Sequence, residues 1–205
     1  MISFEQFLLD VASRGEAVNT FFERRLFGLI GMLHRITDTL NSAGIPHEVV
    51  GGLAVLIYVE EANPEHTALT SHVDLMVHRS DLERIKEAGA KDGFRFDQGA
   101  KGDRLIYGPD EREKYAVRFV FSGEKIGPMQ QDSNPPIDPV VKVVHEKEVL
   151  VIPILDLIRM KLNSYRRVDQ VHLKTMDLVG LVTPDVEKTL TQELAARLKY
   201  IRETE

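Results

Sequence analysis

The sequence predicts an α/β fold in which helices flank a mixed β-sheet. Two observations support this prediction. Short runs rich in Val, Ile and Phe alternate with stretches of helical periodicity between residues 47 and 152, and Gly, Pro or charged turns separate them. From residue 153 onward the periodicity is helical. We therefore expect an α/β domain in residues 1–152, which includes the N-terminal helices, and a C-terminal helical region in residues 153–205 packed on it.

The composition of the 205-residue chain excludes several classes of protein. With 43% hydrophobic and 28% charged residues, it is neither collagen-like, low-complexity nor fully disordered. Its 26 Lys and Arg against 32 Asp and Glu give a net charge of -6, so we expect no extended surface for nucleic acid. The absence of cysteine excludes disulfides, thiolate metal sites and cysteine nucleophiles. Without a basic leader or a membrane-length apolar stretch, the expected location is the cytoplasm, with no membrane partner.

The first forty residues are expected to be helical. Apolar residues recur there at spacings of three and four from Phe21 to Leu40, and the segment 41–44 is a helix stop. In chain order we then expect a strand at 47–50, a glycine turn at Gly51-Gly52, a helix at 53–58, a strand at 73–77 and a helix at 81–90. This order predicts that the two strands are neighbours in one sheet.

Residues 94–152 are expected to add strands joined by hairpins. The candidates are 94–96, 105–107, 115–121, 140–144 and 149–152, the last two pairing across a charged turn at 145–148. A loop is expected at 128–139, where Pro is frequent. Helices are then expected at 154–166, 168–180 and 189–202.

Two features near the first pair of strands could carry chemistry. The period of two in the strand at 71–77 places His72 and Asp74 on one face, where they could converge on a divalent cation. The alternative is that Asp74 binds a neighbouring turn at the end of its strand. Gly51 and Gly52 could let backbone N-H groups approach a phosphate, or they could simply form a tight turn. These four residues are expected to line one cleft.

Lys161 is unusual because it falls inside the apolar arc of its predicted helix. Its ammonium could reach solvent along a buried stem, or it could point into a cleft at a phosphate. Residues 156–174 also carry three more basic than acidic residues, five against two, although the whole chain is acidic. On the following helix, His172 is expected to be a core histidine near Asp169.

Together these motifs resemble the nucleotidyltransferase superfamily of the DNA polymerase beta type, especially the minimal nucleotidyltransferases and the abortive-infection toxins. That family has a strand, Gly-Gly, a helix, and then Thr-x-Asp-hydrophobic-Asp on the next strand. Here the motifs read Val49-Val-Gly-Gly-Leu-Ala-Val55 and Thr70-Ser-His-Val-Asp-Leu-Met-Val77, followed by Arg159-Met-Lys-Leu-Asn-Ser-Tyr-Arg166 and Asp169. The resemblance spans roughly residues 45–180.

The resemblance implies a set of site residues. Magnesium would be held by Asp74, helped by His72, and both would be catalytic. The nucleotide would be bound by Gly51, Gly52, Thr70, Lys161 and Arg166. The resemblance thus implies transfer of a nucleotidyl group from a nucleoside triphosphate to an acceptor.

Two departures from the family pattern keep a second function open. His72 stands where the family has its first metal aspartate, and the strand at 115–121 offers Arg118 on the face where a third carboxylate is expected. The alternative is a catalytically impaired protein that binds a nucleotide or a protein partner, as in a toxin-antitoxin pair. A carboxylate from a distant segment, such as Asp97, Asp103 or Glu124, would favour the enzyme if it converged on Asp74.

Overall fold

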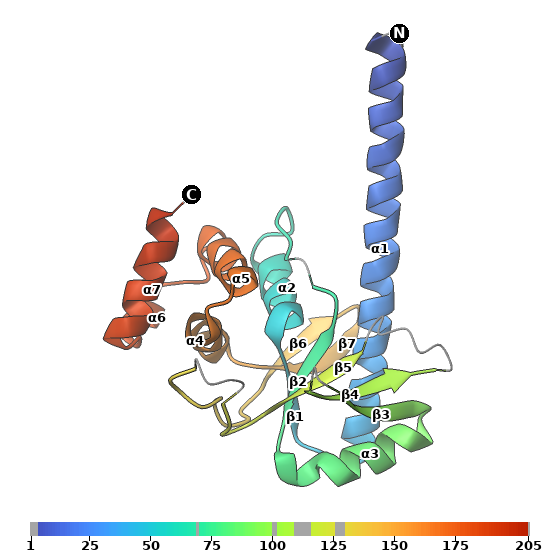
Figure 1. Ribbon diagram of the computed structural model, residues 1–205, viewed down its shortest axis with the longest axis vertical. Helices are drawn as coiled ribbons and strands as arrows, with labels where there is room; N and C mark the ends of the chain where they lie inside the picture. Colours follow the sequence, from blue (N-terminus) through green and yellow to red (C-terminus); the bar gives the residue numbers. More distant parts are fainter. Residues whose placement is uncertain (1–3, 69, 100–101, 109–115, 126–129, 205) are drawn as a thin grey trace.

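A mixed seven-stranded sheet forms the centre of the protein, with the strand order β3-β4-β5-β2-β1-β7-β6. The computed structural model describes residues 4–68, 70–99, 102–108, 116–125 and 130–204. In Figure 1, the long helix α1 runs along one side of the sheet and helices α4 to α7 gather on the other. The predicted α/β class, a mixed sheet flanked by helices, is confirmed.

The sheet positions the predicted site at its centre. The strands are β1 (His47–Val50), β2 (Val73–Val77), β3 (Phe94–Gly99), β4 (Gly102–Tyr107), β5 (Val117–Phe121), β6 (Val140–Val144) and β7 (Lys147–Val151). Strands β1 and β2 are neighbours, as predicted; they run antiparallel, and Val50 lies opposite Asp74. Strand β5 runs parallel to β2 on its other side and places Arg118 beside Asp74.

The helices follow the predicted order, with changes at their ends. They are α1 (Phe4–Ser42), α2 (Gly51–Ala62), α3 (Leu82–Lys91), α4 (Ile154–Ser164), α5 (Arg167–Leu178), α6 (Pro184–Lys188) and α7 (Gln192–Glu203). The glycine pair is the first turn of α2 rather than a separate turn. The helix expected at 189–202 is α7, which begins three residues later because Thr191 accepts a hydrogen bond from the Leu194 N-H; the short helix α6 before it was not predicted.

The hairpin of β6 and β7 is tighter than predicted. Its turn consists of His145 and Glu146, both with positive φ (45° and 66°), which suits a two-residue connection between twisted strands. Strand β7 therefore begins at Lys147 rather than at residue 149. Of the strand predicted at 115–121, residue 115 lies outside the described residues.

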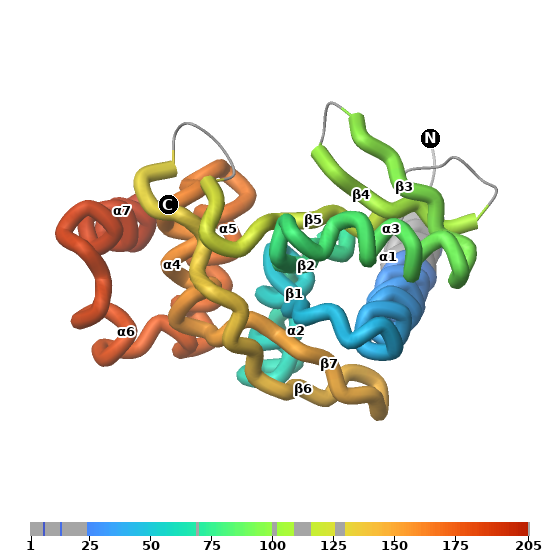
Figure 2. The backbone as a smooth tube through the Cα atoms, turned by 90° about the horizontal axis from the view of Figure 1, so that it is seen from below, coloured from blue at the N-terminus to red at the C-terminus, as the bar shows by residue number. Residues whose placement is uncertain are grey.

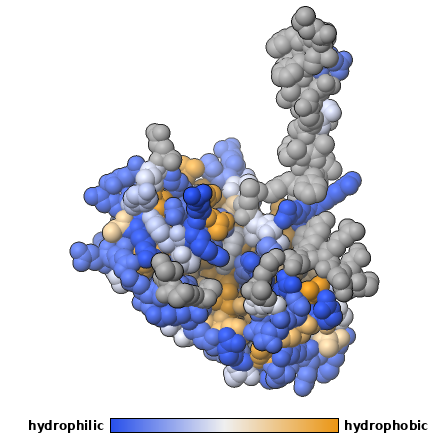
Figure 3. Space-filling view, viewed as in Figure 1, coloured by the Kyte–Doolittle hydropathy of each residue, from blue (hydrophilic) through white to orange (hydrophobic). Residues whose placement is uncertain are grey.

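The core lies between the sheet and the helices packed on it. The helical periodicity of α1 is confirmed by Leu33, Ile36 and Leu40, which are fully buried. Among the described side chains of α1, Leu29 is the first buried one, and the helix before it stands clear of the body (Figure 1). Figure 2 shows α1 nearly end-on beside α3, with α4 to α7 at the opposite side. Hydrophilic side chains cover most of the face of the body in Figure 3.

Within the described part of the chain, no helix combines the length and the apolar character needed to cross a bilayer.

Candidate functional site

A small cavity of about 200 Å³ opens where the centre of the sheet meets helices α4 and α5. Gly51, Asp74 and Arg118 line it from the sheet side. Lys161, Arg166 and Asp169 line it from the helix side. These are residues from five separate segments, so the fold alone brings them together.

Asp74 and Arg118 form a bidentate ion pair across β2 and β5. The Arg118 Nε donates to Asp74 Oδ1 at 2.7 Å, and its Nη2 donates to Oδ2 at 3.1 Å. Both side chains leave the same face of the sheet because the two residues are in register. The guanidinium thus takes both oxygens of the one acidic residue that the motif retains.

The two glycines are required by the close approach of neighbouring side chains. Gly51 has φ +71°, and a Cβ there would lie 2.4 Å from Asp74 Oδ2. A Cβ on Gly52 would lie 2.8 Å from Thr70 Oγ1 and 3.2 Å from His172 Cε1. The pair therefore lets the start of α2 sit directly against the residues of the site.

His72 and Thr70 lie beside the cavity rather than in its lining. His72 precedes β2, and its Nδ1 is 2.7 Å from Ser71 Oγ. Thr70 Oγ1 donates to the His72 carbonyl oxygen at 3.4 Å. Of the predicted site residues, the structure brings Gly51, Asp74, Lys161 and Arg166 together around the cavity.

Of the two alternatives for Lys161, the ammonium that reaches solvent is wrong, because Lys161 forms a buried ion pair at the cavity. Its side chain is 6% exposed, that of Asp169 is 0% exposed, and Lys161 Nζ lies 2.9 Å from Asp169 Oδ1. Asp169 also accepts hydrogen bonds from Ser164 Oγ at 2.7 Å and from Arg166 Nε at 2.8 Å. Burial raises the pKa of Asp169, but these hydrogen bonds and the Lys161 charge outweigh burial and lower it to about 2.

No third carboxylate converges on Asp74 among the residues that would have restored a metal site. Asp97 pairs with Arg104 at 2.6 Å, while Asp103 and Glu124 both pair with Arg79, at 3.5 Å and 2.6 Å. Within the described ranges, no three His, Cys, Asp or Glu side chains are grouped so that they could hold a metal ion. Magnesium prefers several oxygen ligands, so this donor set does not fit it.

The arrangement suits an anion instead. The cavity lining contains three cationic side chains, Arg118, Lys161 and Arg166, and two carboxylates, Asp74 and Asp169, which leaves one net positive charge. The side chain of Arg166 is 67% exposed, so its remaining N-H groups can reach a ligand. The first N-H groups of α2 add the positive end of a helix dipole.

Sequence reasoning missed the roles of Arg118 and Asp169. The alternation in β5 correctly placed Arg118 on the face of Asp74. The sequence analysis, however, treated Arg118 only as a missing carboxylate and did not predict its ion pair with Asp74. Asp169 was paired in sequence with His172, three positions away, whereas its partners are Lys161 and Ser164 of α4 and Arg166. The signal available was the buried cation at Lys161, since a cation in an apolar arc requires an anion nearby.

No family model matches the chain, and no curated protein does either. Solved structures do match it. An antigenic nucleotidyltransferase-like protein from Paracoccidioides brasiliensis has a TM-score of 0.57 at 13% identity, over 85% of this chain and 87% of that one. The lincosamide antibiotic adenylyltransferase LnuA has a TM-score of 0.52 at 10% identity, over 73% and 96%. The antibiotic-resistance factor ANT(2'')-Ia has a TM-score of 0.50 at 11% identity, over 85% and 91%. The chain therefore has the nucleotidyltransferase fold.

Proposed function

We propose that this protein binds a nucleoside triphosphate through its phosphates, without magnesium, and that it is a catalytically impaired form of the nucleotidyltransferase fold. The observation that carries the proposal is the bidentate Arg118–Asp74 ion pair. Both oxygens of the Asp74 carboxylate are engaged by the guanidinium, and the positive charge of Arg118 at this distance disfavours a metal cation on the same carboxylate. The guanidinium, in contrast, keeps donors for an anion, because Asp74 engages only two of its five N-H groups.

The binding mode follows from the lining of the cavity. Arg118 from the sheet and Arg166 from the helix side would donate hydrogen bonds to phosphate oxygens. The backbone N-H groups of the first turn of α2, which begins at Gly51, would donate to the same phosphate. Lys161 would contribute charge rather than a direct contact, because its ammonium is held by Asp169. The cavity of about 200 Å³ takes part of the phosphate tail, so the nucleoside would extend into solvent.

Titration calorimetry with ATP and GTP, each with excess EDTA and with excess Mg²⁺, tests the proposal. We expect binding to be at least as tight in EDTA, because Mg²⁺ on the triphosphate neutralises the charge that the cations recognise. Binding that requires Mg²⁺, or no binding in EDTA, would contradict the proposal.

A pair of matched variants assigns the binding to this cavity. Arg118→Gln is expected to weaken binding about 10- to 100-fold, the range for losing charge-assisted hydrogen bonds. Arg104→Gln is the control, because Arg104 lies opposite Arg118 in the sheet but pairs with Asp97 outside the cavity lining. We expect Arg104→Gln to bind as the wild type does.

Nucleotidyl transfer is the second candidate function, favoured by the fold and by the retained Gly51–Asp74 contact. Its test is release of pyrophosphate from nucleoside triphosphates with Mg²⁺ present. Turnover in the wild type that is lost in Asp74→Asn would replace the binding proposal with the enzyme. The acceptor would then be a separate question.

A further inference from the structure

Strand β6 forms one edge of the central sheet, with no other described strand beyond it (Figure 2). A residue next to a two-residue turn bonds to the facing strand, and the direction of the backbone groups alternates along the strand. Val144 therefore faces β7, and the N-H and C=O groups of Val141 and Val143 face outward. Within the described ranges these four groups have no hydrogen-bond partner.

This edge lacks the features that usually protect an edge strand, which are charged side chains, Pro within the strand or a covering element. β6 reads Val-Val-Lys-Val-Val, and its one charge, Lys142, is turned to Glu61 of α2. Val141 and Val143 are 57% and 70% exposed. The opposite edge strand, β3, in contrast carries two charged residues in Phe-Arg-Phe-Asp-Gln-Gly, and α3 packs beside it. β6 is therefore the edge that is open to a further strand.

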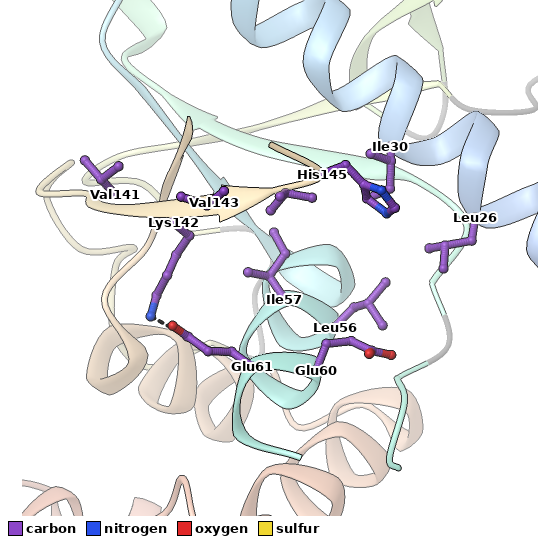
Figure 4. A pocket seen from close by; sticks show the side chains of 11 residues that line it. Leu26, Ile30, Leu56, Ile57, Glu60, Glu61, Val141, Lys142, Val143 and His145 are labelled. Carbon is purple, nitrogen blue, oxygen red and sulfur yellow. Dashed lines mark hydrogen bonds and ion pairs between the residues drawn. The ribbon is translucent and has the colours of Figure 1, made fainter. Parts of the chain in front are cut away.

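An apolar groove of about 590 Å³ runs beside this open edge. Leu56 and Ile57 of α2 line one side of it, and Leu26 and Ile30 of α1 line one end. Figure 4 shows these side chains around the space between β6, α1 and α2. A strand added about 4.8 Å outside β6 would direct every second side chain toward α2, which is into this groove.

The rim of the groove carries an available negative charge. Two carboxylates, Glu60 and Glu61, and one ammonium, Lys142, are among the lining residues. Lys142 pairs with Glu61. Glu60 is exposed and forms no ion pair with any residue in the described ranges. An incoming Lys or Arg would therefore find a carboxylate that is not already paired.

We propose that β6 receives an extended segment of another protein as an additional antiparallel strand. In an antiparallel ladder one residue of the segment pairs with both backbone groups of Val141, and another pairs with both groups of Val143. The side chains of these residues lie beside the two exposed valines, and the intervening side chains enter the groove. The recognised segment thus has aliphatic residues on one face, and an aliphatic residue with a Lys or Arg on the face toward α2.

The outward backbone groups select a strand over other occupants. A helix bonds its own backbone groups, and a lipid chain carries no row of N-H and C=O groups, so neither would pair with β6. A second copy of β6 is disfavoured by charge, because its Lys142 is already held by its own Glu61, and its Glu60 would add a carboxylate to the rim. The length required is short, since β6 has five residues.

A synthetic peptide tests the pairing in the full chain. The peptide has seven residues, with valine at the odd positions, isoleucine at the centre and lysine at the two remaining positions. We expect saturable binding, measured by fluorescence polarisation of the labelled peptide, with the valines beside Val141 and Val143 and a lysine beside Glu60. The absence of binding would overturn the proposal.

Two N-methylated forms of this peptide separate strand pairing from adhesion of apolar side chains. Methylation of the two inner valines removes N-H groups that face β6, whereas methylation of the two lysines removes N-H groups that face solvent. We expect the first form to bind about tenfold more weakly than the unmodified peptide, and the second to bind within about twofold of it. Equal affinities of the two forms, or the reverse order, would contradict an antiparallel strand at β6.

Val143→Pro assigns the binding to β6. Proline removes an outward N-H group, and edge strands tolerate it at such positions. We expect about tenfold weaker binding of the peptide and an unchanged circular dichroism spectrum. Gln98→Pro is the matched control, because Gln98 is exposed on the opposite edge strand, and it should bind the peptide as the wild type does. Undiminished binding by Val143→Pro would refute the site.

Glu60→Lys tests the groove without altering the strand. Reversing this charge should weaken peptide binding about two- to fivefold, the scale of an exposed ion pair. Glu65→Lys, an exposed residue beyond the end of α2, is its control and should have no effect. Unchanged binding by Glu60→Lys would show that the basic residue of the segment does not lie at this rim, contrary to the proposal.

The oligomeric state distinguishes another protein from a second copy of this chain. Light scattering over a concentration series should give the mass of one chain for the wild type and for Val143→Pro. A wild-type dimer that Val143→Pro dissociates would show that β6 pairs with itself, and it would overturn the proposal.

Discussion

Glu48 is a carboxyl group buried in the middle of the molecule, on the face of β1 that also carries Val50. One of its oxygens accepts the Asp138 N-H at 3.2 Å, and the other has no hydrogen-bond partner among the described residues. Burial is the largest cause that raises the pKa of Glu48, to about 7; the Asp138 hydrogen bond opposes it, and the nearby carboxylates of Asp156 and Asp138 add to it. The folded protein therefore prefers the neutral acid.

Glu48→Gln is expected to stabilise the protein at neutral pH. Between the ordinary pKa of 4.5 and about 7, the unfolded chain ionises at this residue while the folded protein keeps its proton, so wild-type stability falls as pH rises. Glutamine removes this loss, with a gain on the order of 3 kcal/mol at most at pH 7 and almost none below pH 4.5. Urea unfolding from pH 4 to 8 measures it. Exposed Glu65→Gln is the control, and a gain that does not change with pH would contradict the explanation.

Asp169→Asn is expected to destabilise the protein by about 3–5 kcal/mol at pH 7, because it leaves the Lys161 ammonium buried without a counter-charge. Replacing both members, as Lys161→Met with Asp169→Leu, should recover most of that loss. In the wild type, the lowered pKa of Asp169 means that its contribution is present above pH 3.8 and is lost as pH falls toward 2. Denaturant melts of the wild type and the two variants measure this; a double variant as unstable as Asp169→Asn would show that the ion pair is not the cause.

The start of α2 shows how an element depends on one residue. Gly51→Ala is expected to destabilise the protein by about 1–2 kcal/mol from its positive φ alone, and further because the new Cβ would displace Asp74. The same change at Gly31, inside α1 with nothing within 4 Å of its Cβ, should stabilise the protein by about 0.5–1 kcal/mol. Thermal melts of both variants show whether Gly51→Ala lowers the stability and Gly31→Ala raises it. Equal effects would mean that the Gly51 environment is not restrictive.

Most helices and strands could be predicted from the spacing of apolar residues, because buried side chains recur with the period of the helix or strand that carries them. Leu33, Ile36 and Leu40 are examples in α1. Element ends were less predictable: β7 begins at Lys147 because its turn uses two residues of positive φ, which no side-chain pattern announces. The candidate site was predictable in its centre, at Gly51 and Asp74. Its electrostatics were not, since the partner of Lys161 depends on how α4 meets α5.

At the scale of the whole molecule, the sheet pairs strands that are far apart in the sequence. Strand β1 lies between β2, which follows it closely in sequence, and β7, which arrives near the end of the α/β region. Val49 and Val151 are paired although roughly a hundred residues separate them. Helix α4 follows directly, so the helix side of the cavity is also late in the chain.

This connectivity has a consequence for the order in which the protein can fold during synthesis. A ribosome that has made only residues 1–146 has produced β1 with one of its two neighbours missing, so valines that are buried in the finished sheet remain open to water and to other chains. We expect stalled chains ending at residue 146 to be cleaved rapidly by protease, and the full-length chain to become resistant. Pulse proteolysis of chains of increasing length measures this. Resistance already at residue 146 would show that β7 is added to a sheet that is stable without it.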